Sequence, residues 1–204
     1  MKDSHVYSDR SITSLTLLGR AKGNEPGAWD ELVHLYRPLI LYWCLPGRQP
    51  ADAEDFAQEV LYAVGEHLKD FEHNGRPGAF RTWLRTITRH VIANGYRDKG
   101  AGPIAIGGST AHRRLDQVAA PASLQEPTEQ ELSQELTLLY HRAVELIRNE
   151  FSERDHELFR RVCQNGEAPR HVAADLGISA NTVSVAVSRI KKRVRDRFGD
   201  AIHE

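Results

Sequence analysis

The sequence predicts an all-α protein with two small helical domains joined by a flexible linker, and three observations lead to that prediction. Apolar residues recur at the i, i+3, i+4, i+7 spacing of a buried helix face in several segments. No segment of useful length alternates apolar and polar residues as a half-buried strand does. The segment 100–127 is rich in Gly, Pro, Ala and Ser, and it is too long for an ordinary loop inside one compact domain.

The domain boundaries follow from these patterns. We expect a first domain over 11–99 and a second over 128–199, with the linker between them and tails at 1–10 and 200–204. The total length of 204 residues also suits two small domains.

Composition excludes several classes of protein. No uncharged apolar run approaches the ~20 residues that a spanning helix needs, so membrane insertion is not expected. The polar start of the chain excludes a secretory signal. Cys44 and Cys163 are far apart and form no CxxC pair, which argues against a disulfide framework or a zinc ribbon and favours the cytoplasm.

Three amphipathic helices are expected in the first domain. Their apolar stripes are Trp29, Leu32, Val33, Tyr36, Leu39, Ile40 and Trp43, then Ala53, Phe56, Ala57, Val60, Val64, Leu68 and Phe71, then Phe80, Trp83, Leu84, Ile87 and Val91. Asp52 is placed to cap the second of these helices.

The second domain is predicted to end in a helix-turn-helix. Its first helix carries Leu132, Leu136, Tyr140, Ala143, Val144 and Ile147, and Ser152 with Asp155 resembles a capping box. Val172, Ala173 and Leu176 then form a short apolar stripe. Gly177 permits a tight turn, and Ser179 caps a helix whose inward positions are Val183, Ala186, Val187, Ile190 and Val194.

Charge is segregated along the chain, although the formal net charge is only −1. Segments 51–72 and 125–157 are acidic, with seven carboxylates against one lysine and nine against three arginines. Segments 76–99 and 189–197 are basic, each with six cations against one aspartate. Such blocks indicate either solvated helix faces or surfaces that meet charged partners.

Two surfaces of the first domain are candidates for binding. Opposite the apolar stripe of the second helix lies an acidic and polar face with Asp55, Gln58, Glu59, Tyr62 and Glu66. The next segment interleaves aromatic rings with cations, as single-stranded nucleic-acid sites do: Phe80, Trp83 and Tyr96 among Arg76, Arg81, Arg85, Arg89 and Arg97. Phe80 and Trp83 also lie on the core stripe, so packing remains an alternative for both.

These residues carry a resemblance to a known family. The stretch Asp52-Ala-Glu-Asp-Phe-Ala-Gln-Glu-Val60, followed by Phe80-Arg-Thr-Trp-Leu-Arg-Thr-Ile-Thr-Arg89, resembles region 2 of the sigma-70 family of bacterial RNA polymerase sigma factors. The helix-turn-helix resembles region 4 of that family. With only these two regions and a short linker, the chain is similar to the extracytoplasmic-function (ECF) group.

The resemblance implies a transcription initiation factor that binds core RNA polymerase and reads promoters. The clamp helices of the polymerase would be bound by Asp55, Gln58, Glu59 and Tyr62, and the second domain would bind the flap. The −10 element and its opened strand would be held by Phe80, Arg81, Trp83, Arg85, Arg89, His90, Tyr96 and Arg97. The duplex −35 element would be read by Ser179, Asn181, Thr182, Ser184, Val185, Ser188, Arg189, Lys192 and Arg193. A separate anti-sigma protein is a further implied partner.

Two positions depart from the family pattern. The family commonly has Asn where this chain has His90, and often an acid where Asn94 stands beside Gly95, a residue that weakens a helix. His90 either stacks on and hydrogen-bonds a base, or replaces Asn as a cap. The −10 base preference is therefore not transferred to this chain.

Two other classes of protein are alternatives to this hypothesis. A stand-alone helix-turn-helix regulator with a helical sensor domain would leave the paired surfaces of the first domain unexplained. A carboxylate-bridged metal enzyme would need inward Glu-x-x-His pairs. Glu31 and His34 have that spacing, but Glu31 is expected to face solvent. We expect no catalytic residue, no metal site and no cofactor.

Overall fold

The computed structural model describes residues 17–72, 78–98 and 127–202, and within them every regular element is helical, which confirms the all-α prediction. The predicted linker and N-terminal tail lie outside the described residues, except for position 127. The elements are α1 (Leu17–Lys22), α2 (Ala28–Cys44), α3 (Pro50–His67), η1 (Leu68–Asp70), α4 (Ala79–Asp98), α6 (Glu129–Leu146), η3 (Arg148–Glu150), α7 (Glu153–Phe159), the π-helical segment η4 (Arg160–Gln164), α8 (Pro169–Leu176) and α9 (Ala180–Ile202).

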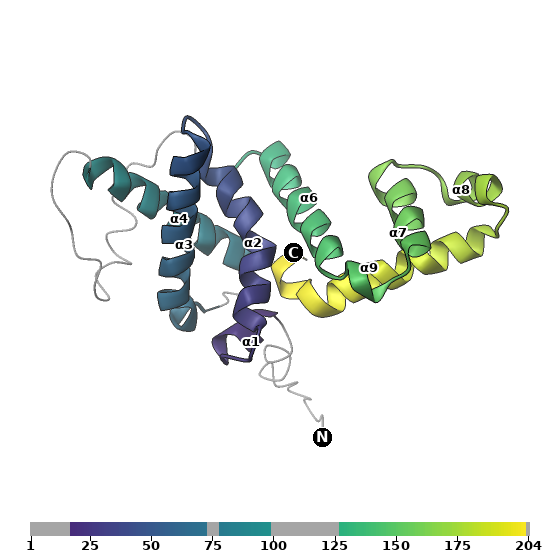
Figure 1. Ribbon diagram of the computed structural model, residues 1–204, viewed down its shortest axis with the longest axis horizontal. Helices are drawn as coiled ribbons and strands as arrows, with labels where there is room; N and C mark the ends of the chain where they lie inside the picture. Colours follow the sequence, from purple (N-terminus) through teal and green to yellow (C-terminus); the bar gives the residue numbers. More distant parts are fainter. Residues whose placement is uncertain (1–16, 73–77, 99–126, 203–204) are drawn as a thin grey trace, which may run out of the picture.

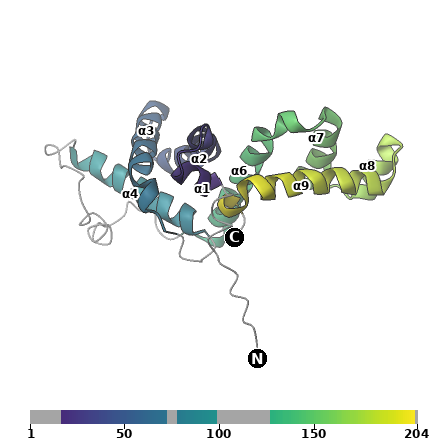
Figure 2. The ribbon, with the colours of Figure 1, turned by 90° about the horizontal axis from the view of Figure 1, so that it is seen from below.

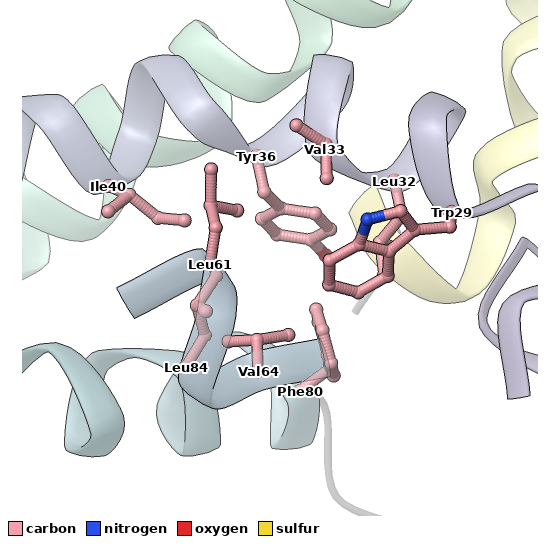
Figure 3. Close-up of a pocket in the computed structure, with 9 residues that line it drawn as sticks. All are labelled: Trp29, Leu32, Val33, Tyr36, Ile40, Leu61, Val64, Phe80 and Leu84. Atoms are coloured by element: carbon pink, nitrogen blue, oxygen red, sulfur yellow. The ribbon is translucent and has the colours of Figure 1, made fainter. Parts of the chain in front are cut away.

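Helices α2, α3 and α4 pack around one shared core (Figure 1). In Figure 3, side chains from α2 meet side chains from the other two helices, with Tyr36 near the centre of the group. The space left between them is about 10 Å³, the volume of one water at most, so this cavity is part of the core. The three predicted apolar stripes are the buried or half-buried faces of these helices.

An aromatic cluster joins α4 to the rest of the first domain. The ring of Phe80 packs edge-on against Tyr36 at 5.0 Å and against Phe71 at 5.3 Å between centroids. The Trp83 ring lies 5.2 Å from Phe71. Rings arranged at such angles contribute more than their buried area alone. Phe80 is only 3% exposed, which favours the packing interpretation for this residue.

Gly95 allows α4 to approach α3 closely. A Cβ added at this position would lie 2.3 Å from Cε1 of Phe56, which is closer than any side chain tolerates. The glycine that weakens the helix by propensity therefore has a packing function, because it makes room for the Phe56 ring.

The helix caps differ in part from prediction. Asp52 was wrongly expected to cap α3: the helix begins at Pro50, Gln49 is the N-cap residue, and Asp52 lies inside the first turn. Proline is well suited to the first helical position, because it has no N–H to leave unpaired. Ser152 caps α7 as predicted, since its Oγ accepts a hydrogen bond from the Asp155 N–H at 3.1 Å. A full capping box joins Thr128 and Glu131 at the start of α6.

In the second domain, α6, α7 and α8 all pack against the long helix α9 (Figures 1 and 2). Phe159 stacks on Tyr140 with 6.0 Å between ring centroids, and burial raises the pKa of Tyr140 to about 12. Helix α9 continues to Ile202, past the predicted start of the C-terminal tail at 200. Phe198 and Ile202 are buried, so the end of this helix is part of the packed structure.

The two domains lie against each other. Helix α6 packs along α2, and the C-terminal half of α9 reaches α1 (Figure 1). The α2–α6 pair is antiparallel: Tyr42 donates a hydrogen bond to Gln134 at 3.2 Å, and about two turns away on each helix Arg142 donates to the His34 carbonyl at 2.8 Å.

The two cysteines provide a test of the core. Burial raises the pKa of Cys44 to about 11, and it also raises the pKa of the half-buried Cys163. Because the thiolate is the reactive form, both thiols should react slowly at pH 8. We expect a thiol reagent to modify Cys163 first in the native protein, and Cys44 only after denaturant unfolds it. Equal rates for both thiols in the native protein would contradict this packing.

No helix among the described residues is both long and apolar enough to cross a membrane.

Candidate nucleic-acid and protein interfaces

The helix-turn-helix has the predicted turn. Gly177 ends α8 with φ +62°, a conformation that glycine adopts without strain. Ser179 begins the next helix, and its Oγ accepts the Thr182 N–H at 3.0 Å. The predicted inward residues of α9 are all buried. Leu176, in contrast, is 43% exposed, so its prediction as part of the apolar stripe was wrong.

Arg161 fixes the segment between η4 and α8. Its guanidinium pairs with Glu167, and it also donates to Asp175 Oδ2 at 2.7 Å. These carboxylates raise the pKa of Arg161, and the arginine lowers the pKa of Glu167. Helix α8 is thereby tied to the start of η4.

All nine side chains predicted to read a duplex are exposed and lie on the N-terminal part of α9 or just before it: Ser179, Asn181, Thr182, Ser184, Val185, Ser188, Arg189, Lys192 and Arg193. Val185, an apolar residue in the second turn of α9, is 48% exposed on the same face. Small polar groups therefore occupy the first turns and cations the later ones. This order suits base edges followed by phosphates.

The cations of this face have intramolecular partners. Arg193 forms an ion pair with Glu150, which raises the pKa of Arg193 and lowers that of Glu150. Lys192 pairs with Asp196 one turn later on the same helix. The Arg189 guanidinium lies 6.0 Å from the Phe151 ring. Exposed pairs of this kind contribute little to stability, so they can exchange for phosphate contacts.

The acidic and polar face of α3 is exposed as predicted. Asp55, Gln58, Glu59 and Tyr62 lie on one side of the helix, and Tyr62 is 73% exposed. Their neighbour Glu54 points elsewhere and pairs with Arg37 of α2. The Tyr62 ring is therefore held in solvent beside two carboxylates, and tyrosine is one of the residues enriched at protein interfaces.

The basic and aromatic segment on α4 is partly covered. Phe80 and Arg81 are buried, and the Arg85 side chain is only 11% exposed. Trp83, Arg89 and His90 are half-buried. The backbone of α4 includes positions 96 and 97, but the side chains of Tyr96 and Arg97 lie outside the described residues, as does Arg76.

A buried carboxylate of the second domain covers this segment. Glu135 of α6 is 1% exposed, and its Oε1 accepts a hydrogen bond from Trp43 Nε1 at 2.8 Å. Arg85 donates to the same oxygen, and Arg81 Nε lies 3.6 Å from Oε2. The Arg85 guanidinium also lies 5.1 Å from the Trp43 ring. In the sequence, Glu135 is one of the carboxylates of the acidic segment 125–157.

Glu31 was wrongly expected to face solvent. Its side chain is 9% exposed and pairs with Arg20 of α1 and Arg197 of α9. His34 is turned away from it, with Nδ1 2.6 Å from the Asp30 carbonyl oxygen. Among the residues that the structure describes, no three His, Cys, Asp or Glu side chains are grouped to hold a metal ion.

Comparisons with known proteins identify the family of the chain. Residues 32–101, a range that includes most of α2 and all of α3 and α4, match the family described as sigma-70 region 2. Over 197 residues the chain is 30% identical to a protein described as ECF RNA polymerase sigma factor ShbA, from Streptomyces griseus subsp. griseus. That similarity spans 93% of this chain and 97% of the relative.

The fold and the matched region define a transcription initiation factor of the sigma-70 class. Within that class, the chain belongs to the ECF group of RNA polymerase sigma factors.

Proposed function

We propose that this sigma factor brings core RNA polymerase to promoters with two elements, reading a −35 duplex through α9 and holding an opened −10 strand through α4. The observation that carries the proposal is the pair of exposed surfaces on separate domains. One is the acidic and polar face of α3, and the other is the helix-turn-helix face of α9. A stand-alone regulator would use the second surface and leave the first without a partner.

The α3 face would bind the polymerase clamp helices. Asp55 and Glu59 would meet basic groups, while Gln58 and Tyr62 would be buried against the partner. The second domain would contact the flap. Because both domains would bind the same polymerase, their separation would be fixed. The −10 and −35 contacts, each weak alone, would then bind together and select promoters that have both elements.

The α9 face would enter the major groove of the −35 element. Asn181, Ser184 and Ser188 would reach base edges, Val185 would contact a thymine methyl group, and Arg189 would neutralise a phosphate or reach a guanine. Ser179 and Thr182 would position the start of the helix through the cap that they form.

Helix α4 would engage the −10 element. Trp83 and Tyr96 would stack on unpaired bases, with Arg81, Arg85, Arg89 and Arg97 holding the backbone. His90 would lie close to the captured base. Phe80 would support this surface from within the core, because the structure buries it. The family resemblance also leads us to propose a cytoplasmic location and a separate anti-sigma protein as inhibitor.

Co-purification tests the proposal. Tagged protein mixed with core RNA polymerase should retain the polymerase subunits in stoichiometric amounts through size-exclusion chromatography. Failure to bind the polymerase of its own organism would overturn the proposal. A palindromic duplex bound tightly without polymerase would support the stand-alone regulator instead.

Loss of two cations from α9 should weaken duplex binding in a salt-dependent way. For Arg189→Ala with Lys192→Ala, we expect the slope of log K against log salt to flatten by about two, because each lost phosphate contact contributes about 0.9. Fluorescence anisotropy with a labelled promoter duplex measures this. Lys69→Ala, an exposed cation of the first domain, is the control, and its slope should equal that of the wild type. An unchanged slope in the double variant would mean that neither cation contacts a phosphate.

A further inference from the structure

Among the described residues, the groups that hold the carboxylate of Glu135 belong to the other domain. Its side chain is 0% exposed, and its oxygens contact Trp43 of α2 and Arg81 and Arg85 of α4. The side chains of these arginines are 8% and 11% exposed. The helix that carries Glu135 comes after the predicted linker, so this cluster exists only while the two domains are in contact.

Such a cluster depends strongly on all its members. A buried carboxylate is costly unless cations and hydrogen-bond donors satisfy it, and a buried guanidinium is costly without its carboxylate. If the domains separate, water can hydrate all three charges. Removing the charge of Glu135 therefore disfavours the closed arrangement and leaves the open one unaffected.

Further polar contacts join the domains, beside buried apolar residues of both domains that belong to one core cluster. The Arg197 side chain of α9 pairs with Glu31 of α2, and the pairs Tyr42–Gln134 and Arg142–His34 lie along α2 and α6. These polar groups can be hydrated when the domains part, so they oppose opening less than buried apolar residues do.

We propose that Glu135 is a latch that closes the second domain over Arg81 and Arg85, so that the free protein must open before these arginines can bind a single strand of DNA. The carboxylate occupies the groups that a phosphate would use. This inference rests on the proposed function, because it concerns the same arginines of the −10 surface. It adds that Glu135 competes with the DNA phosphates for the same two arginines.

The distance between the domains tests the latch without DNA or polymerase. Donor and acceptor dyes are attached through Lys69→Cys and Arg154→Cys, two exposed positions on different domains, in a Cys163→Ser background. Cys44 can remain because it is buried. We expect Glu135→Gln to lower the transfer efficiency, since glutamine keeps the shape and removes the charge. An efficiency equal to that of the unsubstituted sequence would overturn the proposal.

Binding to DNA tests the competition. With a labelled single-stranded oligonucleotide of about 20 nucleotides, we expect the protein without dyes to bind at least about fivefold more tightly after Glu135→Gln, because a larger fraction is open. Equal affinity despite a lower transfer efficiency would overturn the claim that the latch covers a DNA surface. Failure of the wild type to bind polymerase would instead refute the proposed function and leave the distance result intact.

Two further variants provide a control and an independent test of the latch. Glu145→Gln changes an exposed carboxylate of the same helix, and it should leave both the distance and the affinity unchanged. Trp43→Phe removes only the indole donor and keeps a ring in place, so it should open the domains in the same direction but less. Circular dichroism checks that each variant is helical. If Glu135→Gln does not fold, an unchanged distance in Trp43→Phe would overturn the latch.

Discussion

Reversing two charges on α3, Asp55→Arg with Glu59→Arg, should abolish binding to core RNA polymerase. Both carboxylates are exposed, so the variant should fold normally. A basic partner surface would then meet cations instead of anions, and like charges brought together at an interface cost several kcal/mol. We expect the dissociation constant to rise at least about a hundredfold, or about 2.7 kcal/mol. Pull-down and surface plasmon resonance measure this change.

A matched control separates this site from net charge. Asp70→Arg with Glu72→Arg makes the same change in charge on exposed residues of the first domain, outside the α3 face. This control should bind polymerase within about threefold of the wild type, because rim or remote charges contribute little. If the folded α3 variant still bound polymerase, the docking surface would lie elsewhere.

Truncating Phe159 should give the largest loss of stability in the second domain. Phe159 is 1% exposed and stacks on Tyr140, so Phe159→Ala leaves a cavity beneath the helix-turn-helix. Such changes cost about 3–5 kcal/mol. Urea denaturation followed by circular dichroism should show the loss, and binding to duplex DNA should fall with it.

The control for this variant is an exposed aromatic residue. Tyr62→Ala removes a ring that is 73% exposed, and it should change the free energy of unfolding by less than about 0.5 kcal/mol. Equal losses from both variants would mean that Phe159 does not organise the core of the second domain.

The sequence predicts the helices of this fold well, because each buries a face at regular spacing. The apolar stripes on α2, α3 and α4 are the packed faces of the structure. Two caps could also have been found, because proline at position 50 and the Thr128–Glu131 pair are both known signals for a helix start. Leu176 is the exception, because the turn at Gly177 leaves its side chain half in solvent.

Contacts between the domains could not be predicted in the same way. Charged residues are usually solvated, and Glu31 and Glu135 are buried only because arginines distant in sequence reach them. A signal did exist for Glu135, since it precedes Leu139 and Ala143 at intervals of four residues on the buried face of α6. A carboxylate on an apolar stripe indicates a partner, but the partner's identity depends on how the domains pack.

The most direct test of the central claim is transcription from genomic DNA with purified core RNA polymerase, with and without this protein, followed by sequencing of the transcript starts. We expect new starts that appear only when the protein is present and that share one −10 and one −35 element. These starts should be lost with Asp55→Arg and Glu59→Arg. Starts identical with and without the protein, from a polymerase that accepts another sigma factor, would contradict the account.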